Sequence, residues 1–171
     1  MTTNVPPETE DETHARQALQ CKWWAKLVKH TDATLHQHIA PGKLVLFGVG
    51  SEEAEYLIAP SVSLQYWVWA DKCEVSLYID TSIDKYEKPH ESPFRNRKIA
   101  ACERLFARKE NIEASFGDAL DWGNEFITYY IDGGYERADY AWDEIINLQV
   151  GAMNRLHAAV MPHVINIPFL N

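Results

Sequence analysis

"SLQYWVWADKCEVSLYID", residues 63–80, decides the fold class, because it has the pattern of two β-strands joined by a tight turn around Ala70–Lys72. In the second strand, the apolar residues Val75, Leu77 and Ile79 lie on one face, and Tyr78 lies on the other face with polar residues. In the first strand both faces are largely apolar, and one of them carries Trp67 and Trp69. A strand that is apolar on both sides is typical of the middle of a covered sheet, so this hairpin is predicted to be central.

Three amphipathic helices are predicted outside the hairpin, because apolar residues recur there at three- and four-residue steps. The first begins near His14 and continues to Ile39, where the sequence Ala-Pro-Gly ends it. The second follows the N-cap Ser92 and closes at Gly117, which can adopt the left-handed conformation. The third is capped by Asp139.

Two further strands are predicted at residues 43–50 and 122–132, both bounded by glycines. The element order is therefore helix, three strands, helix, strand, helix. The predicted fold is an α+β domain in which a mainly antiparallel sheet of about four strands packs against three helices. The same order occurs in the core of restriction-endonuclease-like nucleases, to which the fold could be related. Residues 1–13 are expected to form a disordered acidic tail, and residues 14–171 a single domain.

Composition limits the possible partners. The chain of 171 residues is 46% hydrophobic and has a net charge of −9, which disfavours non-specific binding to the nucleic-acid backbone. Its three widely spaced cysteines indicate neither a disulfide framework nor a zinc site. No apolar run is long enough to cross a bilayer, so we expect a cytoplasmic protein without a membrane partner.

Complete catalytic motifs are lacking. "GVGSEE", residues 48–53, has neither a third glycine nor a Gly-Lys-Ser/Thr, and His36 and His38 point to different sides of a helix. On the strand where restriction-endonuclease-like enzymes carry Asp/Glu-x-Lys, Glu74 is followed by Ser76 instead of lysine. The sequence therefore predicts no catalytic residue, metal or cofactor, and favours a protein that is not an enzyme.

A basic stripe is predicted on the second helix. Arg97, Arg104 and Arg108 are spaced by seven and four residues, which places them on one helix face. The planar guanidinium group suits phosphate, so the stripe is a candidate site for nucleic acid or an acidic partner surface. The alternative is a solvated helix face that is neutralised by neighbouring glutamates.

An aromatic surface is predicted on the hairpin. Trp67 and Trp69 share one strand face, and Tyr78 falls on the same side of the next strand. These rings are candidates for a platform on which a base or another ring stacks. The alternative is that they belong to a covered core. The six tryptophans are many for one core, and exposed ones would favour a homodimer.

Three segments carry a family resemblance: "VSLYID" at 75–80, "LFARKENIEASFGDALDW" at 105–122 and "AWDEIINLQVGAMNRL" at 141–156. Over residues 20–165 the chain resembles the bacterial family of unknown function DUF4268. The matching positions are Ile112, Glu113, Phe116, Gly117, Leu120, Trp122 and Trp142. Ser76 departs from the family pattern, which tends to have glutamate there.

The resemblance implies an accessory role in DNA metabolism or in restriction and phage defence, since similar domains look like attachments to nuclease or restriction-type proteins. Our leading hypothesis is a non-catalytic binding module that engages nucleic acid or a defence-system protein through the arginine stripe and the aromatic surface. Two alternatives stay open. One is a degenerate or unusual metal-dependent nuclease-like protein, and the other is an acidic inhibitor of a DNA-binding defence protein.

Overall fold

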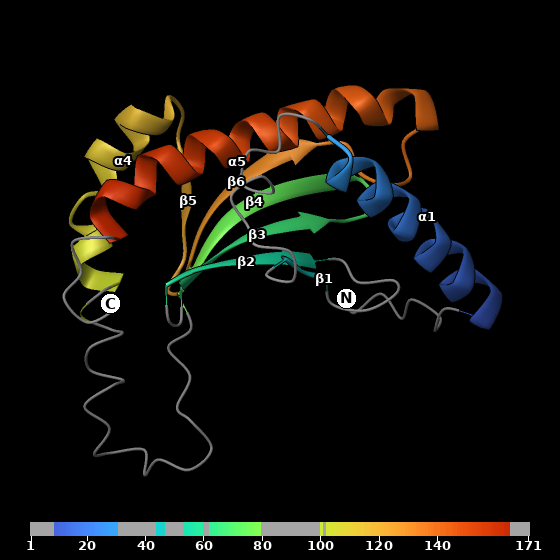
Figure 1. Ribbon diagram of the computed structural model, residues 1–171, viewed down its shortest axis with the longest axis horizontal. Coiled ribbons are helices and arrows are strands. Elements are labelled where there is room, and N and C mark those ends of the chain that lie inside the picture. Colours follow the sequence, from blue (N-terminus) through green and yellow to red (C-terminus); the bar gives the residue numbers. More distant parts are fainter. Residues whose placement is uncertain are drawn as a thin grey trace, which may run out of the picture.

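A computed structural model describes residues 9–30, 44–46, 53–59, 62–79, 100 and 102–164 of the chain. Within these ranges, helices pack on an antiparallel sheet (Figure 1), which confirms the predicted α+β class. The described α-helices are α1 (Glu10–Val28), α4 (Lys109–Phe116) and α5 (Trp142–Val164), and residues 102–106 are also helical. The strands are β1 (Leu44–Leu46), β2 (Glu53–Ala59), β3 (Val62–Val68), β4 (Lys72–Ile79), β5 (Asp121–Trp122) and β6 (Phe126–Asp132).

The sheet has the order β1-β2-β3-β4-β6-β5, and each of its described pairings is antiparallel. As predicted, β3 and β4 form a central hairpin, which turns where the Trp69 amide donates to the Lys72 carbonyl at 2.8 Å. Trp67 lies opposite Glu74 across this hairpin, so both side chains face the same side of the sheet.

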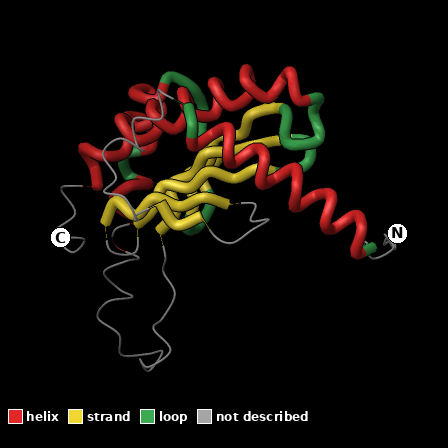
Figure 2. Tube along the Cα trace, turned by 45° about the vertical axis from the view of Figure 1, so that its right-hand side comes forward, coloured by secondary structure: helices red, strands yellow, loops and turns green. Residues whose placement is uncertain are grey.

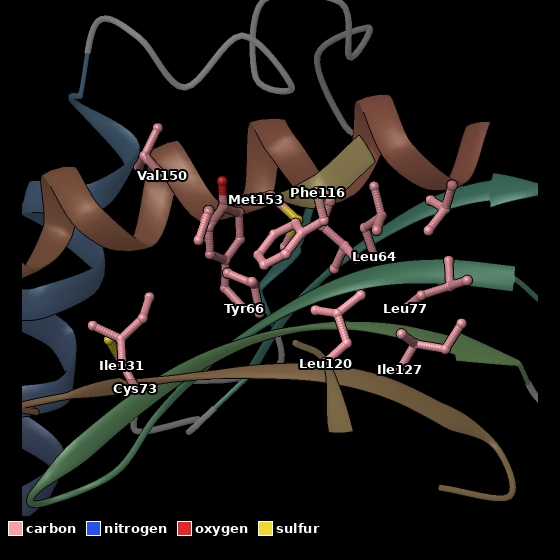
Figure 3. Close-up of a cluster of buried hydrophobic side chains, with 14 of the residues drawn as sticks. Leu64, Tyr66, Cys73, Leu77, Phe116, Leu120, Ile127, Ile131, Val150 and Met153 are labelled. Atoms are coloured by element: carbon pink, nitrogen blue, oxygen red, sulfur yellow. The ribbon is translucent and has the colours of Figure 1, made fainter. Parts of the chain in front are cut away.

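The other side of the sheet carries the core. Helix α5 lies along this face (Figures 1 and 2), and its apolar stripe packs against the inward residues of β3, β4 and β6. Figure 3 shows Met153 and Phe116 among strand residues of this cluster. Gln149 is the polar exception: it is fully buried on α5, and its Nε2 donates to the carbonyls of Trp67 (2.9 Å) and Glu74 (3.2 Å).

Helix α1 packs against the start of α5. Trp23 is fully buried and meets Trp142 edge to face, with ring centroids 5.5 Å apart. The boundaries of α1 differ from those predicted. Thr9 and Glu12 form a capping box, so the helix begins at Glu10 inside the predicted tail, and it ends at Val28 instead of Ile39. The Thr-x-x-Glu spacing was the missed signal. None of the described helices combines the length and the apolar character needed to cross a bilayer.

Three further strand and helix predictions are wrong. Strand β2 was missed because its alternating glutamates resemble a polar turn. The predicted strand 122–132 is instead a hairpin, β5–β6, in which the Gly123 amide donates to the Phe126 carbonyl at 2.8 Å. Asp139 does not cap α5, because it begins a short 3-10 helix, η1 (Asp139–Ala141), whose N-cap is Ala138. Ser92 lies outside the described residues.

The end of α4 is built as the sequence predicts. Gly117 closes the helix with φ of 87°, and Lys109 pairs with Glu113 at 3.9 Å. The Glu113 carboxylate also accepts hydrogen bonds from the Leu120 amide (3.1 Å) and from Trp122 Nε1 (2.9 Å). These two hydrogen bonds, followed by the Lys109 charge, hold the pKa of Glu113 below its usual value. The acid therefore connects the helix to β5.

A close backbone contact fixes the tip of the β3–β4 hairpin. The Tyr135 amide donates to the Trp69 carbonyl at 3.1 Å, and the Glu136 amide donates to the Ala70 carbonyl at 3.0 Å. A Cβ atom on the neighbouring Gly134 would lie 2.0 Å from the Trp69 oxygen and 2.9 Å from the Ala70 carbonyl carbon. Only glycine therefore permits this approach.

We expect Gly134→Ala to lower the free energy of unfolding by roughly 1–3 kcal/mol, because the backbone of residues 69–70 must move. Gly151→Ala is the matched control, since it adds the same atom inside α5, where nothing lies within 4 Å. It should stabilise the protein by up to about 1 kcal/mol. Urea unfolding followed by circular dichroism measures both. Equal effects of the two substitutions would contradict the close contact.

Candidate functional site

Side chains on the sheet face opposite α5 form a pocket of about 380 Å³. The strand register creates it: Glu74 of β4 lies between Trp67 of β3 and Tyr130 of β6, and Thr128 lies opposite Asp121 of β5. We call this site the aromatic pocket. Its lining residues are Trp67, Trp69, Glu74, Asp121, Gly123, Phe126, Thr128 and Tyr130.

The two predicted tryptophans form one wall of the aromatic pocket. The Trp67 and Trp69 rings are nearly parallel, with an interplanar angle of 6° and centroids 5.7 Å apart. Both side chains are only partly buried, so neither is a fully covered core residue. Trp67 Nε1 donates to Gln65 Oε1 at 3.2 Å, and Gln65 is itself buried, which fixes the orientation of the indole.

Tyr78 lies on the predicted face but does not line the aromatic pocket. Its ring stacks on Phe126 with centroids 4.7 Å apart, and Phe126 is a lining residue. Between Tyr78 and Glu74 on β4, the buried Ser76 hydroxyl is 3.1 Å from the Thr128 hydroxyl. Tyr78 therefore supports the pocket wall through Phe126.

Two carboxylates from different strands converge on the pocket. Burial raises the pKa of Glu74, the nearby Lys72 charge lowers it in part, and Asp121 adds a further small increase. The buried Trp69 N–H also favours the ionised acid, although no hydrogen-bond partner has good geometry for it. On the opposite wall, the Tyr130 hydroxyl donates to Asp121 Oδ2 at 3.1 Å. Burial, followed by this hydrogen bond, raises the pKa of Tyr130.

A cation lies at the edge of the pocket. Lys72 Nζ is 4.6 Å from the centroid of the Tyr130 ring, 5.8 Å from that of Trp69 and 3.7 Å from Glu74 Oε2. These contacts combine cation–π attraction with an ion pair, the two interactions by which proteins bind organic cations. The pocket walls therefore place two rings and one carboxylate around a positive charge.

The described residues offer no metal site, because no three of their His, Cys, Asp or Glu side chains group so as to hold an ion. The metal-dependent nuclease alternative requires carboxylates that converge on one pocket, and among the described residues Glu74 and Asp121 share a pocket. His36 and His38 lie outside the described ranges. The pocket can therefore bind and orient a ligand through rings, hydroxyls and two carboxylates.

The arginine stripe is not carried by one continuous helix. The chain is helical at residues 102–106, turns at residues 107–108 and enters α4 at Lys109. Arg108 sits at this interruption with φ of −107° and ψ of 10°, so its spacing from Arg104 does not place the two on one helix face. Both arginines are exposed, while Arg97 lies outside the described residues. Their role in binding stays a prediction.

Sequence reasoning missed Asp121, Tyr130 and Lys72. Asp121 belongs to β5, which was not predicted as a separate strand, and Lys72 was assigned only to a turn. The Gly-Asn pair at residues 123–124 was the available turn signal. Comparison with known protein families, with curated proteins and with solved structures finds no match, so the DUF4268 resemblance and the relation to restriction-endonuclease-like nucleases stay predictions.

The raised pKa of Glu74 gives a stability prediction. Its folded pKa lies above the ordinary value of 4.5, so the folded state binds the proton more tightly than the unfolded state does. This contribution is present below pH 4.5 and is lost as the pH rises through the folded pKa. Glu74→Gln should therefore raise the free energy of unfolding at pH 7, with a gain that disappears toward pH 4.5.

Urea unfolding at a series of pH values measures this gain. The control is Glu136→Gln, which removes an exposed acid outside the pocket and should produce no such pH-dependent gain. A stabilisation that is the same at acid and neutral pH would show that the buried charge at position 74 is not its cause.

Proposed function

We propose that this protein is a non-catalytic binding module that engages a basic protein partner through the aromatic pocket. Following the resemblance to DUF4268, the process is DNA metabolism or restriction and phage defence. The proposal narrows the two partner classes expected from the sequence, nucleic acid and a defence-system protein, to the second.

The observation that carries this proposal is the placement of two carboxylates among aromatic rings. Glu74 and Asp121 lie where a stacked base would bring its phosphate close to negative charge, which costs binding free energy. The same carboxylates attract lysine and arginine side chains, and the rings add cation–π attraction. Aromatic residues are also common energetic centres of protein interfaces.

The net charge of the chain supports a second candidate function, that of an acidic inhibitor. At −9, the chain attracts basic proteins over a distance comparable to the Debye length and speeds their encounter. DNA-binding proteins have basic surfaces, so an acidic inhibitor that covers the DNA-binding surface of a defence protein is the second candidate. It uses the same pocket and differs in the identity of the partner.

Site-specific photo-cross-linking in cells of the source organism tests the proposal. Benzoylphenylalanine in place of Asn124, which is exposed and next to the lining residue Gly123, should yield an adduct that protease digests and nuclease does not. Glu74→Gln should remove this adduct. The control position is Tyr140, which is 89% exposed and lies in η1. A nuclease-sensitive adduct, or equal adducts at both positions, would overturn the proposal.

Charge reversal of the exposed arginines distinguishes a basic protein partner from a nucleic-acid partner. Arg104→Glu with Arg108→Glu should leave the cross-linked adduct intact, or increase it, because a basic partner is not held by cations. If nucleic acid is the partner, the same charge reversal should abolish binding, since phosphate contacts depend on cationic side chains. Quantification of the adduct in the double variant, with circular dichroism as a check of folding, decides between them.

A further inference from the structure

Lys72 shows what kind of ligand the aromatic pocket accepts. Its ammonium group contacts two rings and one carboxylate of the pocket, Tyr130, Trp69 and Glu74. The side chain is 44% exposed and belongs to the first residue of β4. An exposed lysine side chain with four rotatable carbons can leave this position without a change in the backbone.

The space beside Lys72 fits a larger and flatter cation. The parallel Trp67 and Trp69 rings give a wall on which a planar group can stack, and the pocket volume of about 380 Å³ exceeds what one ammonium group fills. Asp121 supplies a second carboxylate from another strand. A flat cation with several N–H donors matches these features better than a compact point charge does.

We infer that the aromatic pocket is a binding site for the guanidinium group of an arginine side chain on the partner, and that Lys72 occupies its edge in the free protein. The guanidinium stacks on the tryptophan wall, pairs with Glu74 and Asp121, and displaces the Lys72 ammonium into solvent. This inference rests on the proposed function and names the group that the pocket recognises.

The position of Lys72 at the pocket edge affects which cationic ligand binds there. A ligand must displace Lys72, so its apparent affinity is the intrinsic affinity multiplied by the fraction of molecules in which the edge is free. A lysine ligand exchanges one ammonium group for another and gains little. An arginine ligand adds stacking and bidentate pairing, so the exchange selects arginine over lysine.

The probes that test this inference are three capped tripeptides, Gly-Arg-Gly, Gly-Lys-Gly and Gly-citrulline-Gly, titrated to about 10 mM because single side-chain contacts bind at millimolar concentrations. Binding is followed by the NMR signals of the indole N–H groups of Trp67 and Trp69. The arginine peptide should shift both signals. The neutral citrulline peptide, which has nearly the same shape, should bind about tenfold more weakly or worse.

Two substitutions test separately the competition from Lys72 and the pairing of the ligand with Glu74. Lys72→Ala should tighten binding of the arginine peptide by about two- to fivefold, because it removes the internal competitor. Glu74→Gln should weaken it by about tenfold or more. Lys26→Ala is the matched control: it makes the same change in net charge at a lysine that pairs with Asp143 at 2.7 Å, and should leave the affinity unchanged.

Each contrary result overturns the inference. Equal binding of the arginine and citrulline peptides, weaker binding in Lys72→Ala, equal gains in Lys72→Ala and Lys26→Ala, or no shift with any peptide would each do so. If the cross-linked protein partner persists when the arginine peptide fails to bind, this inference is wrong while the proposed function stands. If the peptide binds but no protein cross-links beside the pocket, the proposed function is wrong.

Discussion

The buried amide of Gln149 links the core of this protein to its candidate site. From the middle of α5 it donates to the main-chain carbonyls of Trp67 and Glu74, which lie opposite each other in the β3–β4 hairpin. A buried polar group without partners costs about 1–3 kcal/mol, so the helix has one preferred position along the hairpin. The side chains of the same two hairpin residues point away from α5 and form the aromatic pocket. The core therefore determines where the pocket walls stand.

Backbone contacts at the hairpin tip complete this constraint. The loop after β6 runs so close to Trp69 and Ala70 that only a glycine fits at position 134. The amides of Tyr135 and Glu136 in this loop donate to the Trp69 and Ala70 carbonyls. The aromatic pocket is thus held by regular strands and a pinned turn, which keeps its rings in place before a ligand arrives. Glu74 is the exception to this stable arrangement, because its burial disfavours the charge that it carries. A charge kept in a pocket at a cost in stability is typical of a functional site.

Local patterns predicted the elements whose information lies within a few residues. The side-chain period of two in residues 63–80 was enough to place Trp67, Trp69 and Tyr78 on one face, and Gly117 marked the end of α4. Two of the predictions that are wrong concern breaks inside continuous patterns. Apolar spacing continues through the turn at residues 107–108, and aromatic residues continue across Gly123, so neither periodicity marked the interruption. Strand β2 was missed because paired strands need not be apolar at every alternate position.

By itself, the sequence determined the α+β class, the central hairpin and the face on which the two tryptophans lie, since a side-chain period of two acts within one strand. Only the tertiary structure decided that Asp121 and Tyr130 join them, because antiparallel pairing brings β6 beside β4 across about fifty residues of chain and places β5 on the other side of β6. It also decided that the Lys72 ammonium lies over Tyr130, a contact between residues far apart in sequence. A pocket built by strand pairing has no local pattern, because each strand holds only part of it.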